Sequence, residues 1–256
     1  MRKVLLCEIN VSEGIDPKKI AAITRALENV EGISIMDINS NPDHNRSVYT
    51  FLGDPERVLE GAKRISDAAL DQIDMSVHKG SHPRMGAVDV VPFVPIRNVS
   101  QEEALKIARE YGRYLGEKGV PVYYYEDAAT RPERKLLVNI RKGQYEALEE
   151  KMKDPAWIPD EGPFSFCPKW GATVTGVRFA LIAFNVNLKT DDLEIGKAIA
   201  KAVRFSSGGF HSVRAIALSL EERRQVQVSM NLVNYRMTPI PLVFETVKML
   251  ADSYGV

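Results

Sequence analysis

Hydrophobic residues recur along the chain with two periods, and segments of one period alternate with segments of the other. Four stretches place apolar residues three or four positions apart, as one face of a helix requires. Each begins with residues suited to opening a helix: Asp16-Pro17, Asp54-Pro55, Ser100 with Glu103, and Thr238-Pro239. We therefore predict helices that start at these places.

Runs rich in β-branched and aromatic residues lie between the helices and predict strands. They cover residues 4–11, 33–38, 48–52, 87–96 and 122–125 in the first half, and 179–188, 213–220 and 226–233 in the second. The first half reads strand, helix, strand, strand, helix, strand, with a further helix and strand. The second half repeats this order and stops after its second helix, where one more strand would be due.

A short internal echo supports a duplicated plan. Glu8-Ile9-Asn10-Val11 corresponds to Ala183-Phe184-Asn185-Val186 at the same place in each half. We therefore predict a mixed α/β (α+β) fold of two split β-α-β, ferredoxin-like subdomains over residues 1–176 and 177–256, the second lacking its last strand. Residues 142–176 are rich in proline and glycine and predict an ordered loop that wraps between the two bodies.

Composition narrows the class of protein. Hydrophobic residues make up 45% and charged residues 27%, which is typical of a globular chain, and the formal net charge is zero. A balanced charge gives no sign of a nucleic-acid partner. The two cysteines form no disulfide framework, and no apolar run is long enough for a signal peptide or a membrane span. We expect a cytoplasmic protein with neither nucleic acid nor membrane as a partner.

The densest group of chemically active side chains is His78-Lys79-Gly80-Ser81-His82-Pro83-Arg84-Met85-Gly86. Imidazole exchanges protons near neutral pH, and Arg84 is a permanent cation, so His82 is the candidate catalytic residue. A zinc pair of His78 and His82 would need a helix, which Gly80 and Pro83 disfavour, so we predict no metal site. A structural pair of turn histidines is the alternative.

Two further stretches are candidates for ligand binding. Residues 37–47 are expected to form a loop between two strands, and its Asp37, His44 and Arg46 are predicted to line a cleft, the alternative being a self-satisfied Asx-rich turn. Residues 162–173 combine prolines, aromatic rings and Lys169, which suits a flat anionic ligand, or else a well-packed linker. Cys167 is expected to be a packing residue rather than a nucleophile.

Five stretches taken together resemble the formiminotransferase domain of the formiminotransferase-cyclodeaminase family. They are Asn10-Val11-Ser12-Glu13-Gly14, Asn45-Arg46-Ser47-Val48-Tyr49-Thr50, His82-Pro83-Arg84-Met85-Gly86-Ala87-Val88-Asp89, Pro168-Lys169-Trp170-Gly171-Ala172-Thr173 and Leu181-Ile182-Ala183-Phe184-Asn185-Val186-Asn187-Leu188. The resemblance runs in order from about residue 4 to the end. Asn39 departs from it, because mammalian members have aspartate there. The chain is also expected to lack the cyclodeaminase domain.

The resemblance implies a glutamate formimidoyltransferase of histidine degradation. Such an enzyme moves a formimino group between N-formimino-L-glutamate and N5 of tetrahydrofolate, its co-substrate, in a tunnel between two sheets. It also implies a homodimer. The catalytic histidine falls on His82. The folate-binding segment falls on Pro163, Phe164, Ser165, Phe166, Cys167, Pro168, Lys169, Trp170, Gly171 and Ala172.

Our mechanistic hypothesis gives His82 both halves of the proton transfer, with Arg84, Arg46 and Lys169 as ligands of substrate carboxylates. Three alternatives stay open at this point. The donor could be 5-formyltetrahydrofolate, passing a formyl group to glutamate. The chain could be a non-catalytic folate-binding module. An RNA-binding sheet would need exposed aromatic residues, for which the run of tyrosines at 123–125 is the one suggestive feature.

Overall fold

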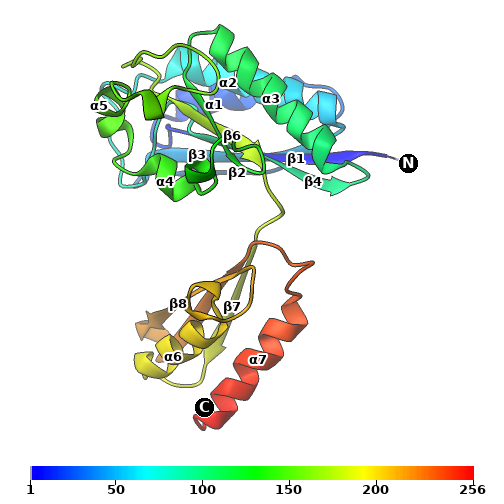
Figure 1. Cartoon of the computed structure of the whole chain (residues 1–256), viewed down its shortest axis with the longest axis vertical. Helices are drawn as coiled ribbons and strands as arrows, with labels where there is room; N and C mark the ends of the chain where they lie inside the picture. Colours follow the sequence, from blue (N-terminus) through cyan, green and yellow to red (C-terminus); the bar gives the residue numbers. More distant parts are fainter. Residues whose placement is uncertain (1) are drawn as a thin grey trace. The chain divides into compact units, whose positions relative to one another are not determined.

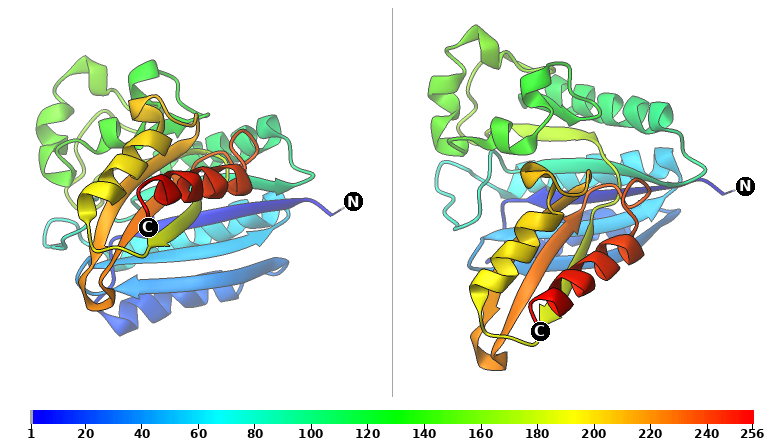
Figure 2. Two further views of the ribbon diagram at one scale, coloured as in Figure 1. Left: turned by 90° about the horizontal axis from the view of Figure 1, so that it is seen from below. Right: turned by 60° about the horizontal axis from the view of Figure 1, so that its bottom comes forward.

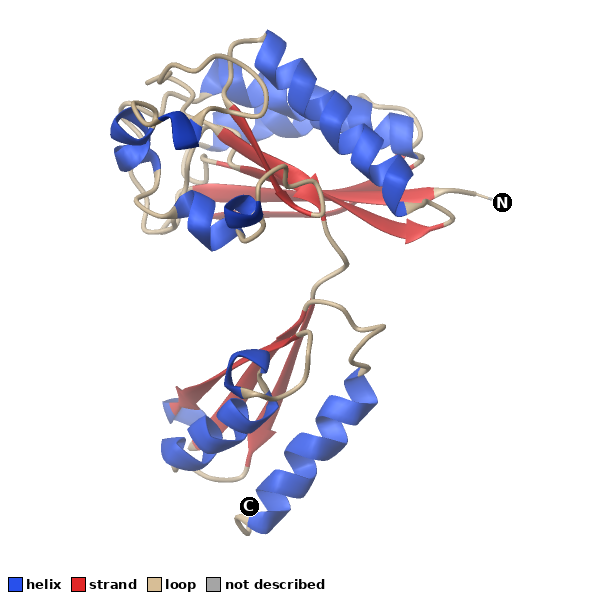
Figure 3. Ribbon diagram, viewed as in Figure 1, coloured by secondary structure: helices blue, strands red, loops and turns tan. Residues whose placement is uncertain are grey.

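The chain divides into two compact units, the first ending at Arg178 and the second covering Phe179–Val256. The structure is a computed structural model that describes residues 2–256. Figure 1 labels the elements along the chain, and Figure 3 separates helices from strands. Each unit has its own sheet, and the hydrophobic clusters of the two units share no residue. The predicted mixed α/β fold is confirmed.

The first unit is built on a six-stranded sheet with the order β2-β3-β1-β4-β6-β5. Strands β2, β3, β1 and β4 are antiparallel neighbours, whereas β4, β6 and β5 run parallel. Three helices cover one face of this sheet (Figure 1). The elements are β1 (Val4–Val11), α1 (Pro17–Glu28), β2 (Ile33–Asn41), β3 (Arg46–Gly53), α2 (Pro55–Gln72), β4 (Val90–Arg97), α3 (Gln101–Glu117), β5 (Val122–Glu126) and β6 (Thr173–Val177).

The second unit repeats the first five elements of the first. Its three strands pair antiparallel in the order β7-β9-β8, and α6 and α7 lie against one face of the sheet (Figure 2). The elements are β7 (Ile182–Leu188), α6 (Leu193–Val203), β8 (Val213–Leu220), β9 (Gln225–Leu232) and α7 (Ile240–Ser253). In the first unit β4 pairs with the edge of β1 that β3 leaves free, whereas within residues 179–256 no strand pairs with the corresponding edge of β7. The expected three-stranded second sheet is confirmed.

The predicted helix starts have recognisable physical causes. The Asp16 carboxylate accepts hydrogen bonds from the backbone of Lys18 and Lys19 at the start of α1, and the Ser100 hydroxyl accepts one from Glu103 N at 3.1 Å at the start of α3. Asp54 precedes α2 without such a bond. Because capping satisfies backbone donors that a helix leaves free, it fixes where α1 and α3 begin.

The proline- and glycine-rich segment is not a linker between the two bodies, which corrects the prediction for residues 142–176. Its last residues form β6, which lies inside the first sheet between β4 and β5. The residues before β6 fold over the face of the sheet that α1–α3 leave open and bury a second cluster there. This covering segment contains the short helices η1 (Pro132–Arg134), α4 (Leu137–Arg141), η2 (Tyr145–Ala147), α5 (Leu148–Lys151) and η3 (Pro155–Trp157).

The three consecutive tyrosines of β5 belong to the core. Tyr123 and Tyr125 lie beneath the covering segment, and the Tyr124 hydroxyl on the helical face donates to Arg109 O at 3.1 Å. Side chains buried in this way offer no surface on which a base could stack. Within residues 2–256, none of the helices combines the length and the hydropathy that crossing a bilayer requires.

Candidate functional site

The turn between β2 and β3 packs against the segment that carries the predicted catalytic histidine. Asn45 Nδ2 donates to Lys79 O at 2.8 Å, and Ser81 N donates to Asp43 O at 3.2 Å. Gly80 approaches the turn so closely that a Cβ there would lie 2.3 Å from His44 O. The chain thus requires glycine at position 80 to bring the two segments together.

The same region corrects the prediction of a loop over residues 37–47. Strand β2 continues to Asn41 and β3 begins at Arg46, so only residues 42–45 form the turn. Asp37 is therefore a strand residue, paired in register with Thr50. It is exposed on the edge strand and is not among the residues that contact His82.

His82 is half-buried and hydrogen-bonded through both ring nitrogens. Nδ1 lies 2.7 Å from Pro83 O, and Nε2 lies 2.7 Å from Nη1 of Arg46. A guanidinium only donates and a carbonyl only accepts, so Nδ1 carries the proton and Nε2 accepts from Arg46. The ring of His44 lies beside that of His82, with centroids 5.5 Å apart. The structure therefore holds His82 as one neutral tautomer.

Arg46 is held in turn by Asn10, a residue of β1. The Asn10 amide nitrogen donates to Glu8 O at 3.0 Å and to Val90 O at 3.2 Å, which directs its oxygen toward Arg46. Arg46 donates to that oxygen from Nε at 2.9 Å and from Nη2. Asn10, Arg46 and His82 thus form one chain of hydrogen bonds. Asn10 was not predicted as a site residue, although the sequence echo with Asn185 marked its position.

Burial and charge both act on this chain of hydrogen bonds. Burial of the ring, and then the Arg46 charge, lower the pKa of His82 below its usual value. Burial also lowers the pKa of Arg46. Among the described side chains, no carboxylate lies within ion-pair distance of Arg46. The Arg46 charge is therefore available to an anion.

Arg84 has a different environment, although it is only two residues from His82. Its guanidinium is buried and donates twice to the Glu146 carboxylate, at 2.9 and 2.7 Å. It lies over the ring of Tyr145 at 5.8 Å and donates from Nε to Nδ1 of His78 at 3.3 Å. To bind a substrate carboxylate, as predicted, Arg84 would have to exchange Glu146 for it.

The end of the predicted folate-binding segment lies alongside the residues that follow His82. Ala87 N donates to Trp170 O at 2.9 Å, and Ala172 N donates to Met85 O at 3.0 Å. Between these bonds Gly86 faces Gly171 so closely that a Cβ on Gly171 would lie 2.1 Å from Met85 O. The structure thus brings together two stretches that are more than 80 residues apart in the sequence.

The side chains of the predicted folate-binding segment fall into two groups. Trp170 packs on the helical core and donates from Nε1 to Leu70 O at 3.0 Å, and Phe166 packs 5.6 Å from the ring of Tyr145. Gly171 and Ala172 are buried. The rest of the segment is exposed or half-buried and consists of Pro163, Phe164, Ser165, Cys167, Pro168 and Lys169.

A buried ion pair adjoins the histidine segment. Asp89 is fully buried, accepts from Met85 N at 2.8 Å and binds Nη2 of Arg141, a residue of α4. Nε of Arg141 is buried without a hydrogen-bond partner. Both charges are close enough to influence the pKa of His82 and of Arg46. Asp89 ends one of the family motifs, but no local pattern predicts its pairing with Arg141, 52 positions away.

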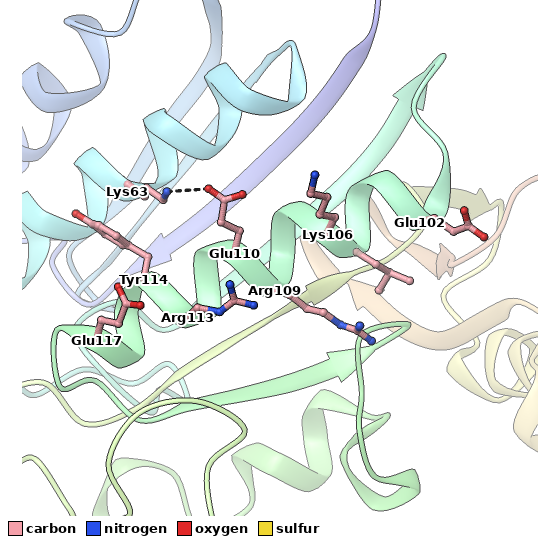
Figure 4. A pocket seen from close by; sticks show the side chains of 9 residues that line it. Lys63, Glu102, Lys106, Arg109, Glu110, Arg113, Tyr114 and Glu117 are labelled. Carbon is pink, nitrogen blue, oxygen red and sulfur yellow. Dashed lines mark hydrogen bonds and ion pairs between the residues drawn. The ribbon is translucent and has the colours of Figure 1, made fainter.

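Within residues 2–256, no group of three or more histidine, cysteine, aspartate or glutamate side chains is arranged to hold a metal ion. A depression of about 660 Å³ lies on α3 and includes Lys63, Glu110 and Arg113 (Figure 4). It is lined by both signs of charge and includes none of the predicted site residues.

Comparisons with known proteins converge on one family. Residues 4–178 match the formiminotransferase domain, N-terminal subdomain, and residues 183–256 match the formiminotransferase domain. Two relatives named glutamate formimidoyltransferase are 42% identical (Streptococcus pyogenes; 100% of this chain and 86% of the relative) and 45% identical (Thermoplasma acidophilum; 98% and 83%). A mouse formimidoyltransferase-cyclodeaminase is 46% identical over 100% of this chain and 48% of its own length.

Proposed function

The chain belongs to the formiminotransferase family, and we propose that it transfers a formimino group between N-formimino-L-glutamate and N5 of tetrahydrofolate. The names of its relatives, glutamate formimidoyltransferase, support the transferred group and glutamate as its carrier, and the family implies tetrahydrofolate as the co-substrate. The observation that carries the proposal is the hydrogen-bonded chain of Asn10, Arg46 and His82. It brings together an amide, a cation and a base, one from each of three motifs that carry the family resemblance.

The chemistry requires one group to move a proton twice. N5 of tetrahydrofolate attacks the amidine carbon, and the resulting tetrahedral intermediate has two nitrogens that compete to leave. His82 takes the proton from N5 at Nε2 and gives it to the glutamate nitrogen, so that the C–N bond to glutamate breaks as the bond to N5 is retained. The Nδ1 hydrogen bond to Pro83 O supports this assignment, because it leaves Nε2 as the basic nitrogen.

The co-substrate is proposed to lie against the predicted folate-binding segment. Phe164 and Lys169 are exposed there and offer an apolar face and a cation to a flat, anionic ligand. Arg46 and Lys169 are the proposed carboxylate ligands, and Arg84 is a third only if it releases Glu146. Four further points stay predictions that rest on the family resemblance: a tunnel between two sheets, a role in histidine degradation, a cytoplasmic location and a homodimer.

The experiment that tests the function compares two one-carbon donors. Purified protein is incubated with tetrahydrofolate and N-formimino-L-glutamate, and in parallel with 5-formyltetrahydrofolate and glutamate, and the folate products are separated. We expect N5-substituted folate from the first pair. Transfer from the second pair alone would establish the formyl reaction instead. Folate binding with transfer from neither pair would identify a non-catalytic module.

A further inference from the structure

The nitrogen that the proposed reaction needs is already engaged in the structure. Nη1 of Arg46 lies 2.7 Å from Nε2 of His82 and donates its hydrogen to the nitrogen lone pair. A lone pair occupied in this way cannot accept a proton from N5. Arg46 must therefore leave Nε2 before His82 can act as a base.

The Arg46 guanidinium is held in a defined position, but its charge has no ion-pair partner among the described residues. Its contacts with Asn10 hold the guanidinium from one side, and Asn10 is itself fixed by two backbone carbonyls. Its other side-chain contact is with an uncharged imidazole, and no described carboxylate forms an ion pair with it. A guanidinium binds a carboxylate through two charge-assisted hydrogen bonds, which are stronger than one bond to a neutral nitrogen. A carboxylate that enters the site would therefore replace His82 Nε2 as the hydrogen-bond acceptor of Arg46 Nη1.

A second arginine lies near the first. Arg141 influences the pKa of both Arg46 and His82, and its one described acidic partner is the buried Asp89. Nε of Arg141 is buried with no hydrogen-bond partner among the described residues. Asp89 pairs with Arg141 and acts on Arg46 only without direct contact, as does Glu8. Two guanidinium groups and one carboxylate act on His82, so positive charge is in excess there. Such a region favours an anion with more than one carboxylate.

We propose that Arg46 is a carboxylate-responsive latch on His82. In the free protein Arg46 occupies Nε2. When the glutamate part of the substrate arrives, its carboxylate draws Arg46 away, and Nε2 becomes a free base only while a dicarboxylic amino acid is bound. The latch rests on the proposed function in one respect, namely that His82 is the proton carrier. Arg46 is then a positioning residue that couples substrate binding to the activity of the base.

The latch predicts the direction in which the His82 pKa responds. The charged groups that act on His82 are Arg46 of β3, Arg141 of α4 and the buried Asp89, and His44 of the turn faces its ring. Removing Arg46 from Nε2 takes away a positive charge and leaves the other groups in place. The pKa of His82 must therefore rise when a carboxylate binds Arg46, and also when Arg46 is replaced by a neutral residue.

The first test follows the His82 imidazole by NMR titration, with its signal assigned by loss in His82→Asn. We expect the His82 pKa to be higher in Arg46→Met than in the wild type. Saturating L-glutamate should raise the pKa in the wild type and leave it unchanged in Arg46→Met. Lys79→Met is the matched control, because it removes an exposed cation from the same segment without touching Nε2. It should keep the glutamate response.

The second test separates the latch from simple carboxylate binding. We expect Arg46→Met to raise the KM for formiminoglutamate by about 10- to 100-fold, as loss of a charged hydrogen bond does. The acid limb of its kcat/KM profile should also move to higher pH. A carboxylate ligand that did not act on His82 would change KM without moving that limb. A wild-type His82 pKa that does not respond to glutamate overturns the latch, and this measurement needs no Arg46 variant. A response in a protein that transfers nothing supports the release of Nε2 by a carboxylate and rejects the proposed function.

Discussion

At the scale of single residues, the two histidines of the site segment resist protonation. Burial lowers the pKa of His78 below its usual value and Arg84 adds to the effect, although the contact with Asn45 O opposes it. Burial and Arg46 lower the pKa of His82 in the same way. The folded protein therefore binds fewer protons at these rings than the unfolded chain does, which ties stability to pH.

This difference predicts a loss of stability in mild acid. As the pH falls below about 6.5, the unfolded chain takes up protons at both imidazoles before the folded protein does. The free energy of unfolding should therefore decrease until the pH reaches the pKa values of His78 and His82 in the folded protein. Below that pH these two histidines should cause no further change. Urea titrations between neutral and mildly acidic pH measure how the free energy of unfolding depends on pH. The double variant His78→Gln, His82→Gln should show a flatter dependence, and an identical one would refute the assignment.

The sequence predicted which residues belong to the site better than it predicted which side chains they contact. The motifs marked His82, Arg46 and His44, and the structure places these three side by side. Sequence could not show that Arg84 is neutralised by Glu146, 62 positions away, because no local pattern encodes such a pair. It also grouped Asp37 with His44 and Arg46 because the three are close in sequence, whereas continuation of β2 separates Asp37 from them.

At the scale of elements, two helix starts offer a matched comparison. Asp16 accepts backbone hydrogen bonds at the start of α1, whereas Asp54 accepts none at the start of α2. We expect Asp16→Ala to lower the free energy of unfolding by about 1 kcal/mol. Asp54→Ala should cost clearly less. Chemical denaturation of both variants checks this, and equal losses would show that the capping bonds contribute nothing specific.

The contact between the β2–β3 turn and the histidine segment gives a second prediction. A methyl group on Gly80 would meet the backbone of His44, which cannot move as a flexible side chain could. Gly80→Ala should therefore shift His82 relative to Arg46 and lower turnover more than it lowers stability. Lys79→Ala is the neighbouring control, because its carbonyl keeps the bond from Asn45. Turnover and thermal midpoints, measured together, decide between displacement of the site and general destabilisation.

The elements themselves were predicted unevenly. Caps and periodicity located the starts of α1 and α3 closely, because both signals are local. Strand β6 was missed, since Gly176 and the preceding prolines resemble a loop, and its alternation of threonine and valine is only five residues long. A short parallel strand in the middle of a sheet is formed by its neighbours, so its own sequence carries a weak signal.

At the scale of the whole molecule, the two units have separate cores. Tyr49, Phe51 and Phe93 anchor the first, whereas Val226, Val228 and Met230 belong to the second. We expect the fragment that ends at Arg178 to fold alone, with a cooperative thermal transition and the same low His82 pKa as the full chain. A fragment without a near-ultraviolet circular dichroism signal would contradict the independence of the first core.

The central claim is that His82 carries the proton in formimino transfer, and steady-state turnover of His82→Ala tests it most directly. His82 is half-buried and makes few contacts, so the variant should fold. Its turnover with tetrahydrofolate and N-formimino-L-glutamate should fall by about 10² to 10⁴. His211→Ala, which removes an exposed imidazole of the second unit, should stay near the wild type. A folded His82→Ala protein with wild-type turnover would contradict the account.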